Sequence, residues 1–204
     1  FNVARATMRQ AIGIIESEGL VKRRHGLGTF VECEPREQRW LPLASDWNSF
    51  VRMVEPLQPK LILVESAERQ PRIQDGEGKP ATAYQHIKRV HYRDDQPFCL
   101  IDIYLAADIY LRAPDQFRTN IVVPMLAAMP DIAIGKVHQT LTVDGAGQEA
   151  AERLDLPLGA PVANVRRTIG DRTGTCIYVA EITYRGDVVS LEIDLSPTSV
   201  GGMG

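Results

Sequence analysis

The sequence predicts an α+β protein, in which several helices pack against a mixed, mainly antiparallel sheet. Apolar side chains recur at helical spacing near the N-terminus, at Met8, Ala11, Ile12 and Ile15. From residue 60 onward, β-rich stretches follow one another around short polar turns, a pattern typical of antiparallel strands. Short helical pieces lie between these strands.

The first 32 residues predict a helix followed by a hairpin. The helix spans residues 7–19 and ends at Gly19, which favours a helix stop. Two short strands, residues 20–24 and 28–32, flank the turn His-Gly-Leu-Gly, because glycine tolerates the backbone angles of a tight hairpin. Residues 33–42 are polar, contain a proline and lack apolar periodicity, so we expect a linker there.

The remaining elements form the larger domain, residues 43–197. A helix with one apolar face carries Trp47, Phe50, Val51 and Val54. We expect strands over 60–70, 83–92, 97–106, 134–143, 161–171 and 176–187, with 83–106 forming a hairpin and residues 188–195 closing the sheet. Short helical pieces interrupted by Pro114 and Pro124 occupy 106–129, and a helix with Leu154 inward occupies 146–156. Residues 198–204 read as a frayed tail.

Charge divides the chain at the linker. The whole chain carries a net charge of -3, but residues 1–31 hold five basic and two acidic side chains, and the remainder holds 18 basic and 24 acidic ones. A basic segment on an acidic body indicates that one part meets a polyanion. No apolar run approaches a membrane span, and the N-terminus lacks a secretory pattern, so we expect a cytoplasmic protein without a membrane partner.

Cysteine and histidine spacing indicates no metal site and no cofactor. The three cysteines are widely separated and form no CxxC pair, which argues against a disulfide framework or structural zinc. The four histidines show no ligand spacing such as HExxH. A phosphate loop for a cofactor requires GxxxxGK[ST] at the start of a helix, whereas the glycine pair after His25 begins a strand.

The basic segment has the chemistry of a DNA-reading head. Arg5, Thr7 and Arg9 cluster at the start of the first helix, off its apolar stripe, where they could reach base edges or phosphates. Lys22 to Arg24 could contact phosphates, and a glycine turn lets the backbone approach a duplex. The alternative is a solvated charged turn, which describes most short charge runs.

This segment resembles the second half of the winged helix-turn-helix of GntR-type bacterial transcription regulators. The resemblance rests on Ala4-Arg-Ala-Thr-Met-Arg-Gln-Ala11, Glu18-Gly-Leu20 and Arg24-His-Gly-Leu-Gly-Thr-Phe-Val31. Ala4 stands where relatives often have a serine that could cap the helix. The resemblance implies DNA contacts from Arg5, Thr7, Arg9, Lys22, Arg23, Arg24, His25, Gly26 and Gly28. The family's first helix and most of its second would precede Phe1, so we expect this chain alone to bind operator DNA poorly, which a gel shift would test.

The body resembles the UTRA effector-binding domain of the HutC subfamily of these regulators, whose fold is similar to chorismate lyase. The motifs are Arg89-Val-His-Tyr-Arg-Asp-Asp-Gln-Pro97, Leu156-Pro-Leu-Gly-Ala-Pro161 and Glu181-Ile-Thr-Tyr-Arg-Gly-Asp187. The resemblance implies that a small, polar, anionic effector binds at Arg89, His91, Tyr104, Glu181 and Tyr184. Ile101 and Asp102 depart from the family, in which a glutamate followed by a basic residue is common at this place.

Strand periodicity supports part of this site. Arg89 and His91 share one face of their strand by the period of two, so two cations could converge on one anionic group. The alternative is that Arg89 forms a structural ion pair with a carboxylate such as Glu181, and that His91 is a hydrated strand residue. For Asp187, a turn between the last strands is favoured over ligand contact.

The resemblance therefore implies a homodimeric transcriptional regulator, in this family usually a repressor, with double-stranded operator DNA and a small-molecule effector as partners. The competing hypothesis is a lyase or hydrolase of the chorismate lyase fold that would use Arg89 and Glu181 on a carboxylate substrate. No pairing of a nucleophile with a base is visible in the sequence, so we expect no catalytic residues and no enzymatic activity.

Overall fold

The computed structural model describes residues 4–17, 21–24, 28–31, 41–42, 47–54, 60–93 and 95–190. The chain divides into two compact units, Phe1–Trp40 and Leu41–Gly204, and the division falls within the segment 33–42 that the sequence predicts as a linker. The predicted tail, residues 198–204, lies outside the described residues.

The first unit is a helix followed by a hairpin, as predicted. Helix α1 spans Arg5–Ser17, and strands β1 (Val21–Arg24) and β2 (Gly28–Val31) pair in antiparallel register. Gly28 has a φ of 105°, a backbone conformation that residues other than glycine rarely adopt. The apolar stripe is less buried than its spacing predicts: within the described part of this unit α1 packs against β1, and Met8 and Ile15 remain 46% and 37% exposed.

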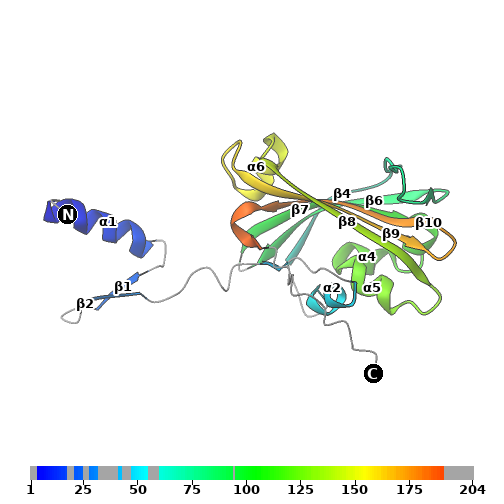
Figure 1. Ribbon diagram of the computed structural model, residues 1–204, viewed down its shortest axis with the longest axis horizontal. Coiled ribbons are helices and arrows are strands. Elements are labelled where there is room, and N and C mark those ends of the chain that lie inside the picture. Colours follow the sequence, from blue (N-terminus) through cyan, green and yellow to red (C-terminus); the bar gives the residue numbers. More distant parts are fainter. Residues whose placement is uncertain are drawn as a thin grey trace, which may run out of the picture. The chain divides into compact units, whose positions relative to one another are not determined.

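The second unit is built on one seven-stranded sheet (Figure 1). Its strands lie in the order β4-β6-β7-β10-β9-β8, and β5 pairs with β10 in parallel. All neighbours along the main order are antiparallel. The strands are β4 (Lys60–Glu68), β5 (Lys79–Pro80), β6 (Tyr84–Arg93), β7 (Gln96–Ala106), β8 (Ile134–Gly145), β9 (Pro161–Asp171) and β10 (Thr175–Arg185).

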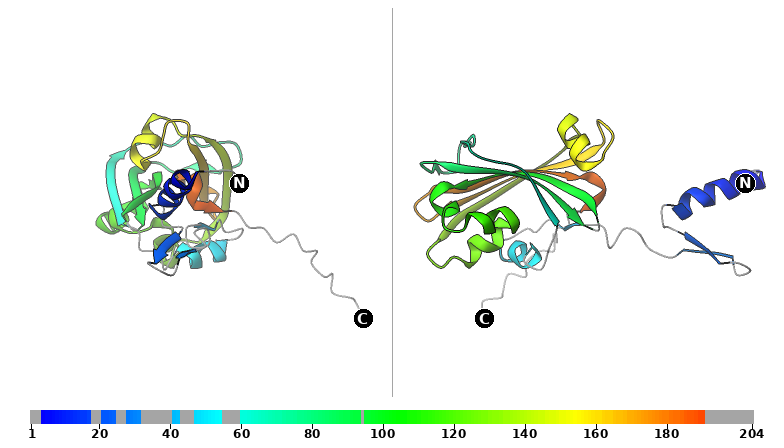
Figure 2. Two further views of the ribbon diagram at one scale, coloured as in Figure 1. Left: turned by 90° about the vertical axis from the view of Figure 1, so that its left-hand side faces the viewer. Right: turned by 180° about the vertical axis from the view of Figure 1, so that it is seen from behind.

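Four helices cover one face of this sheet (Figures 1 and 2). The main core forms between the sheet and these helices, and it includes Phe50, Phe117 and Leu126 from the helices with Ile87 and Ile103 from the strands. We call this the helix face. The four helices are α2 (Trp47–Val54), α3 (Ala107–Tyr110), α4 (Pro114–Thr119) and α5 (Val122–Ala128).

The opposite face is largely polar, and we call it the polar face. Helix α6 (Gln148–Leu154) covers one end of it, where Leu154 packs against Val90 and Leu100. Across the middle of the sheet, Lys88, Asp102, Glu181 and Arg166 lie opposite one another on successive strands β6, β7, β10 and β9. Since residues opposite one another in antiparallel strands share a face, these charges form one row.

The α+β class and the predicted hairpin of residues 83–106 are confirmed by this sheet. Two details differ from the prediction. The described start of the closing segment, β11 (Val189–Ser190), pairs in parallel with β3 (Leu41–Pro42), outside the main sheet. Pro114 and Pro124 lie in the first turns of α4 and α5, where the missing amide hydrogen costs no helical bond, so they begin helices and do not interrupt them.

Candidate functional site

The residues predicted to contact DNA lie on α1 and the hairpin. Arg5, Thr7 and Arg9 are exposed on α1, and so is Lys22 on β1. The Arg23 guanidinium group donates to the Arg9 carbonyl at 3.0 Å and pairs with Glu16 at 3.2 Å. Arg23 therefore fixes the hairpin against α1 in addition to presenting charge. His25 and Gly26 lie outside the described residues, as does the side chain of Arg24.

The predicted effector residues do not form one group, because they lie on opposite faces of the sheet. His91 and Tyr184 both lie opposite Cys99, and Arg89 lies two residues from His91, so these three share the helix face. Tyr104 and Glu181 lie on the polar face, opposite His86 and Asp102 respectively. A small effector could contact the first set or the second, but not both through the sheet.

Arg89 is buried among backbone acceptors. Its side chain is 0% exposed, and Nη1 donates to the carbonyls of Phe117, Arg118 and Asn120 at 3.0, 3.3 and 2.8 Å. These carbonyls lie at the C-terminal end of α4, where the helix dipole favours a cation. Burial lowers the pKa of Arg89 to about 10, so the group stays charged. The suggested ion pair with Glu181 is wrong, because Glu181 lies on the other face.

His91 does not supply the second cation that its position suggests. It is 7% exposed, and burial, followed by the charge of Arg89, lowers its pKa to about 3. The ring is therefore neutral at physiological pH. It meets Phe98 edge to face at 6.0 Å between ring centroids, and Nε2 is buried without a hydrogen-bond partner among the described residues. His91 is thus a neutral polar group beside a buried guanidinium.

The second buried cation is Arg167 on β9, which the sequence analysis does not single out. It is 4% exposed, and its Nε and Nη2 both donate to Oε1 of Gln139 at 2.9 and 2.6 Å. Its guanidinium carbon lies 3.8 Å from the ring centroid of Phe50 on α2, a cation–π contact between the sheet and the helix layer. Arg167 lies opposite Ala180, which places it on the helix face.

The positive charges of Arg89 and Arg167 influence the pKa values of the same two interior groups, Cys99 and Tyr178. Burial raises the pKa of the Cys99 thiol to about 12, while the positive charges of both arginines oppose that rise. Burial likewise raises the pKa of the Tyr178 hydroxyl, again against both arginines. No carboxylate among the described residues forms an ion pair with either guanidinium, although four described arginines and two lysines elsewhere in the second unit have such partners. The helix face therefore holds two buried positive charges without a counter-charge in the described chain.

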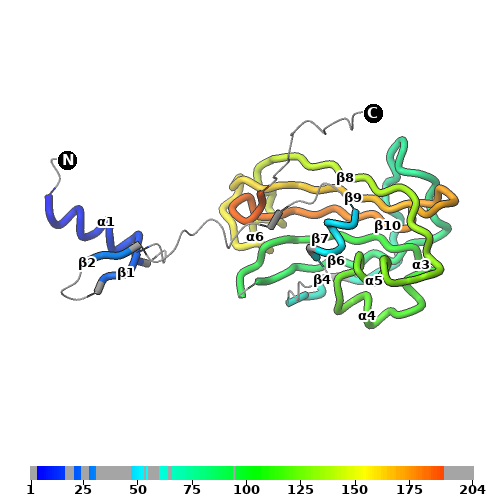
Figure 3. The backbone as a smooth tube through the Cα atoms, turned by 60° about the horizontal axis from the view of Figure 1, so that its bottom comes forward, coloured from blue at the N-terminus to red at the C-terminus, as the bar shows by residue number. Residues whose placement is uncertain are grey.

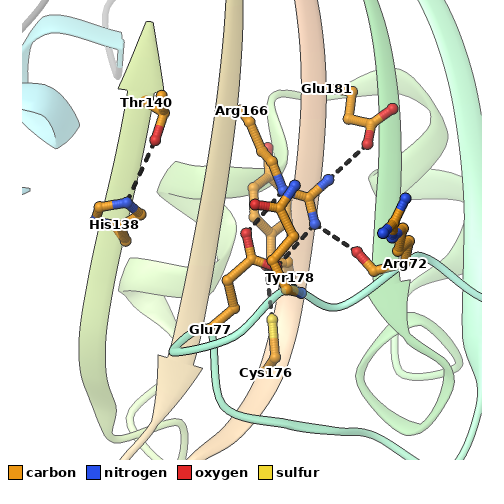
Figure 4. A network of polar contacts seen from close by, with 9 residues as sticks. Arg72, Glu77, His138, Thr140, Arg166, Cys176, Tyr178 and Glu181 are labelled. Atoms are coloured by element: carbon orange, nitrogen blue, oxygen red, sulfur yellow. Dashed lines mark hydrogen bonds and ion pairs between the residues drawn. The ribbon is translucent and has the colours of Figure 1, made fainter.

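The polar face carries a separate network around Arg166 (Figure 4). Arg166 donates to both oxygens of Glu77 at 2.7 and 2.8 Å, to Glu181 at 2.6 Å and to the Arg72 carbonyl at 2.6 Å. Glu77 and Arg72 belong to the loop between β4 and β5, and Lys136 donates to the Gly76 carbonyl of the same loop. The network therefore holds this loop on the polar face.

A second group of contacts occupies the same face beside β6. His86 bonds to Asp102 at 2.7 Å, and Lys88 pairs with Asp102 at 3.4 Å and with Glu149 of α6 at 2.7 Å. The Tyr104 ring lies 4.8 Å from the His86 ring. Positive and negative groups alternate here, in contrast to the helix face, so Tyr104 and Glu181 lie in a charge-compensated surface.

We expect Glu77→Gln to destabilise the second unit in a pH-dependent way. The hydrogen bond from Arg166 is the largest effect on Glu77 and holds its carboxyl pKa below the ordinary value of 4.5. A depressed folded pKa gives a contribution that is present above pH 4.5 and is lost as pH falls through the folded value. Loss of a buried charged hydrogen bond costs about 1–3 kcal/mol. Urea unfolding should show that deficit at pH 7, and a smaller one at pH 3.

The matched control is Glu181→Gln, which removes the exposed carboxylate on the same arginine. The Glu181 side chain is 56% exposed, so its pair with Arg166 should contribute less than about 1 kcal/mol. Equal deficits for the two variants at pH 7, or a Glu77→Gln deficit that grows in acid, would contradict this account of the loop.

Comparison with known proteins identifies the family to which the second unit belongs. The family model for the UTRA domain matches residues 61–190, which is more than half of the chain and includes both faces described above. The chain belongs to the UTRA domain family. The match spans β4 to β11, so the sheet, helices α3, α4 and α5 of the helix face, and α6 lie within it, whereas α2 precedes it.

The relatives of this UTRA protein are regulators of transcription. It is 28% identical over 190 residues to the HTH-type transcriptional repressor NagR of Bacillus subtilis, covering 92% of this chain and 77% of NagR. It is 22% identical over 201 residues to the probable fructoselysine utilization operon transcriptional repressor of Escherichia coli K12, covering 95% and 80%. These relatives confirm the predicted class, a DNA-binding transcriptional regulator with an effector-binding domain, and do not favour the enzyme alternative.

Solved structures support the same fold. The transcriptional regulator YydK of Bacillus subtilis superimposes with a TM-score of 0.62 at 19% identity, covering 95% of this chain and 84% of that one. PhnF of Mycobacterium smegmatis gives a TM-score of 0.60 at 21% identity, covering 96% of this chain and 87% of that one.

None of the described helices is long and apolar enough to cross a membrane.

Proposed function

We propose that this UTRA protein is a cytoplasmic, homodimeric repressor of the HutC subfamily, whose operator affinity is set by a small anionic metabolite bound on the helix face. Arg5, Thr7 and Arg9 read operator bases or phosphates, and Lys22, Arg23, Arg24 and the glycine turn hold the DNA backbone. The names of NagR and the fructoselysine repressor favour repression over activation.

The single observation that supports an anionic effector is that two buried guanidinium groups have no carboxylate partner in the described chain. Burying an unpaired charge costs far more than burying a neutral polar group. Arg89 and Arg167 lie on the same face and act on the same Cys99 and Tyr178. One anionic group between them would relieve both charges, and charge-assisted bonds to arginine are among the strongest in proteins.

Neighbouring side chains narrow the effector further. His91 is neutral, and Ile101, which lies opposite Arg89, is apolar and 6% exposed. Tyr184 offers a hydroxyl on the same face, and burial raises its pKa, so it stays protonated and can donate or accept a hydrogen bond. The effector therefore carries one anionic group on a body with few further charges.

The position of Arg167 suggests how binding reaches the DNA-reading unit. Arg167 stacks on Phe50 of α2, the first helix after the linker segment 33–42. An anion that draws the guanidinium away from Phe50 weakens the contact that holds α2 against the sheet. Effector binding then shifts the population toward a body conformation in which the reading heads are wrongly spaced for the two half-sites, and operator affinity falls.

A thermal-shift series on this chain tests the proposal. Inorganic phosphate, sugar phosphates, phosphonates, amino acids and carboxylates are compared with neutral analogues of the same carbon skeleton. A specific anion at 100 times its Kd should add about 2.7 kcal/mol to the free energy of unfolding. If no anion raises Tm above its neutral analogue, the effector proposal is wrong. If a binder leaves operator affinity of the full-length protein unchanged in fluorescence anisotropy, the switching mechanism is wrong.

A further inference from the structure

Strand β1 is joined to α1 in the first unit through one of its arginines, Arg23 (Figure 3). The Arg23 amide donates to Oε1 of Glu16 at 3.0 Å, and Nε pairs with Oε2 of the same carboxylate at 3.2 Å. Nη2 donates to the Arg9 carbonyl at 3.0 Å. Glu16 therefore holds both the backbone and the side chain of Arg23, and the guanidinium group reaches the turn of α1 that carries Arg9.

Gly13 leaves room for this guanidinium group on α1. A glycine inside a helix lowers the stability of the helix relative to alanine, so a structural reason for it is expected. The Arg9 carbonyl points toward residue 13, because a helical carbonyl accepts from the amide four residues later. A Cβ atom at Gly13 would lie 3.7 Å from Nη2 of Arg23, an ordinary contact distance. Longer helical side chains point back over the preceding turn, so one at this position would take the place of the guanidinium group.

We propose that Glu16 and Gly13 are positioning residues for operator binding, because they fix the angle of the hairpin against α1 through Arg23. The inference rests on the DNA contacts given under "Proposed function", where Arg9 reads the operator from α1 and the hairpin meets the DNA backbone. Phosphate contacts set the register of a protein on a duplex, so the hairpin has to reach its phosphates at a fixed offset from α1. Glu16 and Gly13 provide that offset without touching DNA themselves.

The sign of the Glu16 effect separates positioning from net charge. Residues 1–31 carry five basic and two acidic side chains, and the affinity of a basic segment for DNA rises with its positive charge. If charge alone mattered, loss of the Glu16 carboxylate would tighten binding to DNA of any sequence. If Glu16 positions the hairpin, the same change weakens binding to the operator, because the hairpin no longer meets its phosphates.

Glu16→Gln in the full-length protein tests this sign. The probe is the duplex that the wild-type protein selects from a randomised DNA library, and poly(dI-dC) measures binding without sequence preference. The Kd for the selected duplex should rise about 5- to 30-fold at about 0.15 M salt, because each lost phosphate contact costs about five-fold there. The slope of log K against log salt should fall in magnitude by about 1 to 2. The Kd for poly(dI-dC) should not rise.

Thermal melts check that Glu16→Gln keeps its fold. The Arg23 and Glu16 side chains are 44% and 36% exposed, and exposed ion pairs contribute little to stability. Tm should therefore stay close to that of the wild-type protein, while the affinity for the selected duplex falls.

Two replacements of Gly13 leave the charge of the first unit unchanged. Gly13→Leu places a branched side chain over the turn that carries Arg9, so it should displace the guanidinium group and raise the Kd for the selected duplex to a similar extent. Gly13→Ala is the matched control, because its Cβ atom fits beside Nη2, and it should bind as the wild-type protein does. Leucine and alanine both favour a helix over glycine, so weaker binding by Gly13→Leu is not explained by a less stable α1.

The outcomes separate this inference from the proposed function. Weaker binding of the selected duplex by Glu16→Gln and Gly13→Leu, with unchanged binding by Gly13→Ala, supports positioning. If Glu16→Gln binds that duplex as tightly as wild type or more tightly, or if the two Gly13 variants bind alike, the inference is wrong and the proposed function stands. The inference is also wrong if binding to poly(dI-dC) falls equally, because the two residues then serve only the fold of the unit. If the wild-type protein selects no preferred duplex, both proposals are wrong.

Discussion

The Arg167→Met variant is expected to lose the stabilisation that an anionic effector gives to the wild-type protein. Methionine has a similar length and keeps apolar contact with Phe50, but it removes the buried charge at the helix face. A hydrogen bond to a charged group contributes about 1.5–3 kcal/mol, so the Kd for the anion should rise by about 10- to 150-fold. Isothermal titration calorimetry with the best binder of the thermal-shift series measures this change.

Arg166→Met is the matched control, because Arg166 is the neighbouring residue on the same strand and points to the polar face. It loses the bonds to Glu77 and Glu181 and should be destabilised, but its affinity for the anion should stay within a factor of two or three of wild type. Equal losses of affinity in both variants would mean that Arg167 acts through general stability. A loss in Arg166→Met alone would move the effector to the polar face, where Tyr104 and Glu181 lie.

Much of the architecture follows from local pattern, because strand and helix periods are properties of short segments. The hairpin of β6 and β7, the apolar face of α2 and the inward Leu154 are all visible as alternation or helical spacing. The same period places Arg89 and His91 on one face of β6. The sequence cannot align one strand with another, however, because register depends on pairing between distant segments. For that reason Tyr104 and Glu181 are grouped with Arg89 in the prediction and separated from it in the structure.

Charge state and partner choice are equally invisible in the sequence. His91 reads as a potential cation until its burial beside Arg89 is known. Arg166 and Arg167 are neighbours in the sequence, but adjacent strand residues point to opposite faces, so one joins a carboxylate network and the other is buried without one. The period of two, applied to β9 as it is to β6, would have separated them and marked Arg167 for attention.

The Arg89→Met variant is expected to lose about 2–4 kcal/mol of unfolding free energy in the absence of effector. Three carbonyls at the end of α4 would lose their donor, and each unsatisfied buried acceptor costs about 1–3 kcal/mol, offset in part by removal of a buried charge. Urea unfolding measures the loss. Hydrogen exchange at the amides of residues 117–120 should accelerate as well, because the end of α4 opens more readily.

The same variant also distinguishes a structural cation from one that binds the effector. If Arg89 serves α4 alone, wild type and Arg89→Met gain equal stability from saturating anion, and the difference between them stays constant. If Arg89 also contacts the anion, wild type gains RT ln(1 + [L]/Kd) with a smaller Kd, so the difference widens as the concentration rises. Arg89→Lys sharpens the comparison, because it keeps a positive charge but replaces the planar guanidinium group by a compact, strongly hydrated ammonium group on a flexible stem. If the lysine variant binds the anion well but unfolds at lower urea concentration than wild type, effector binding requires only the positive charge, whereas the stability of α4 requires the shape of the guanidinium group.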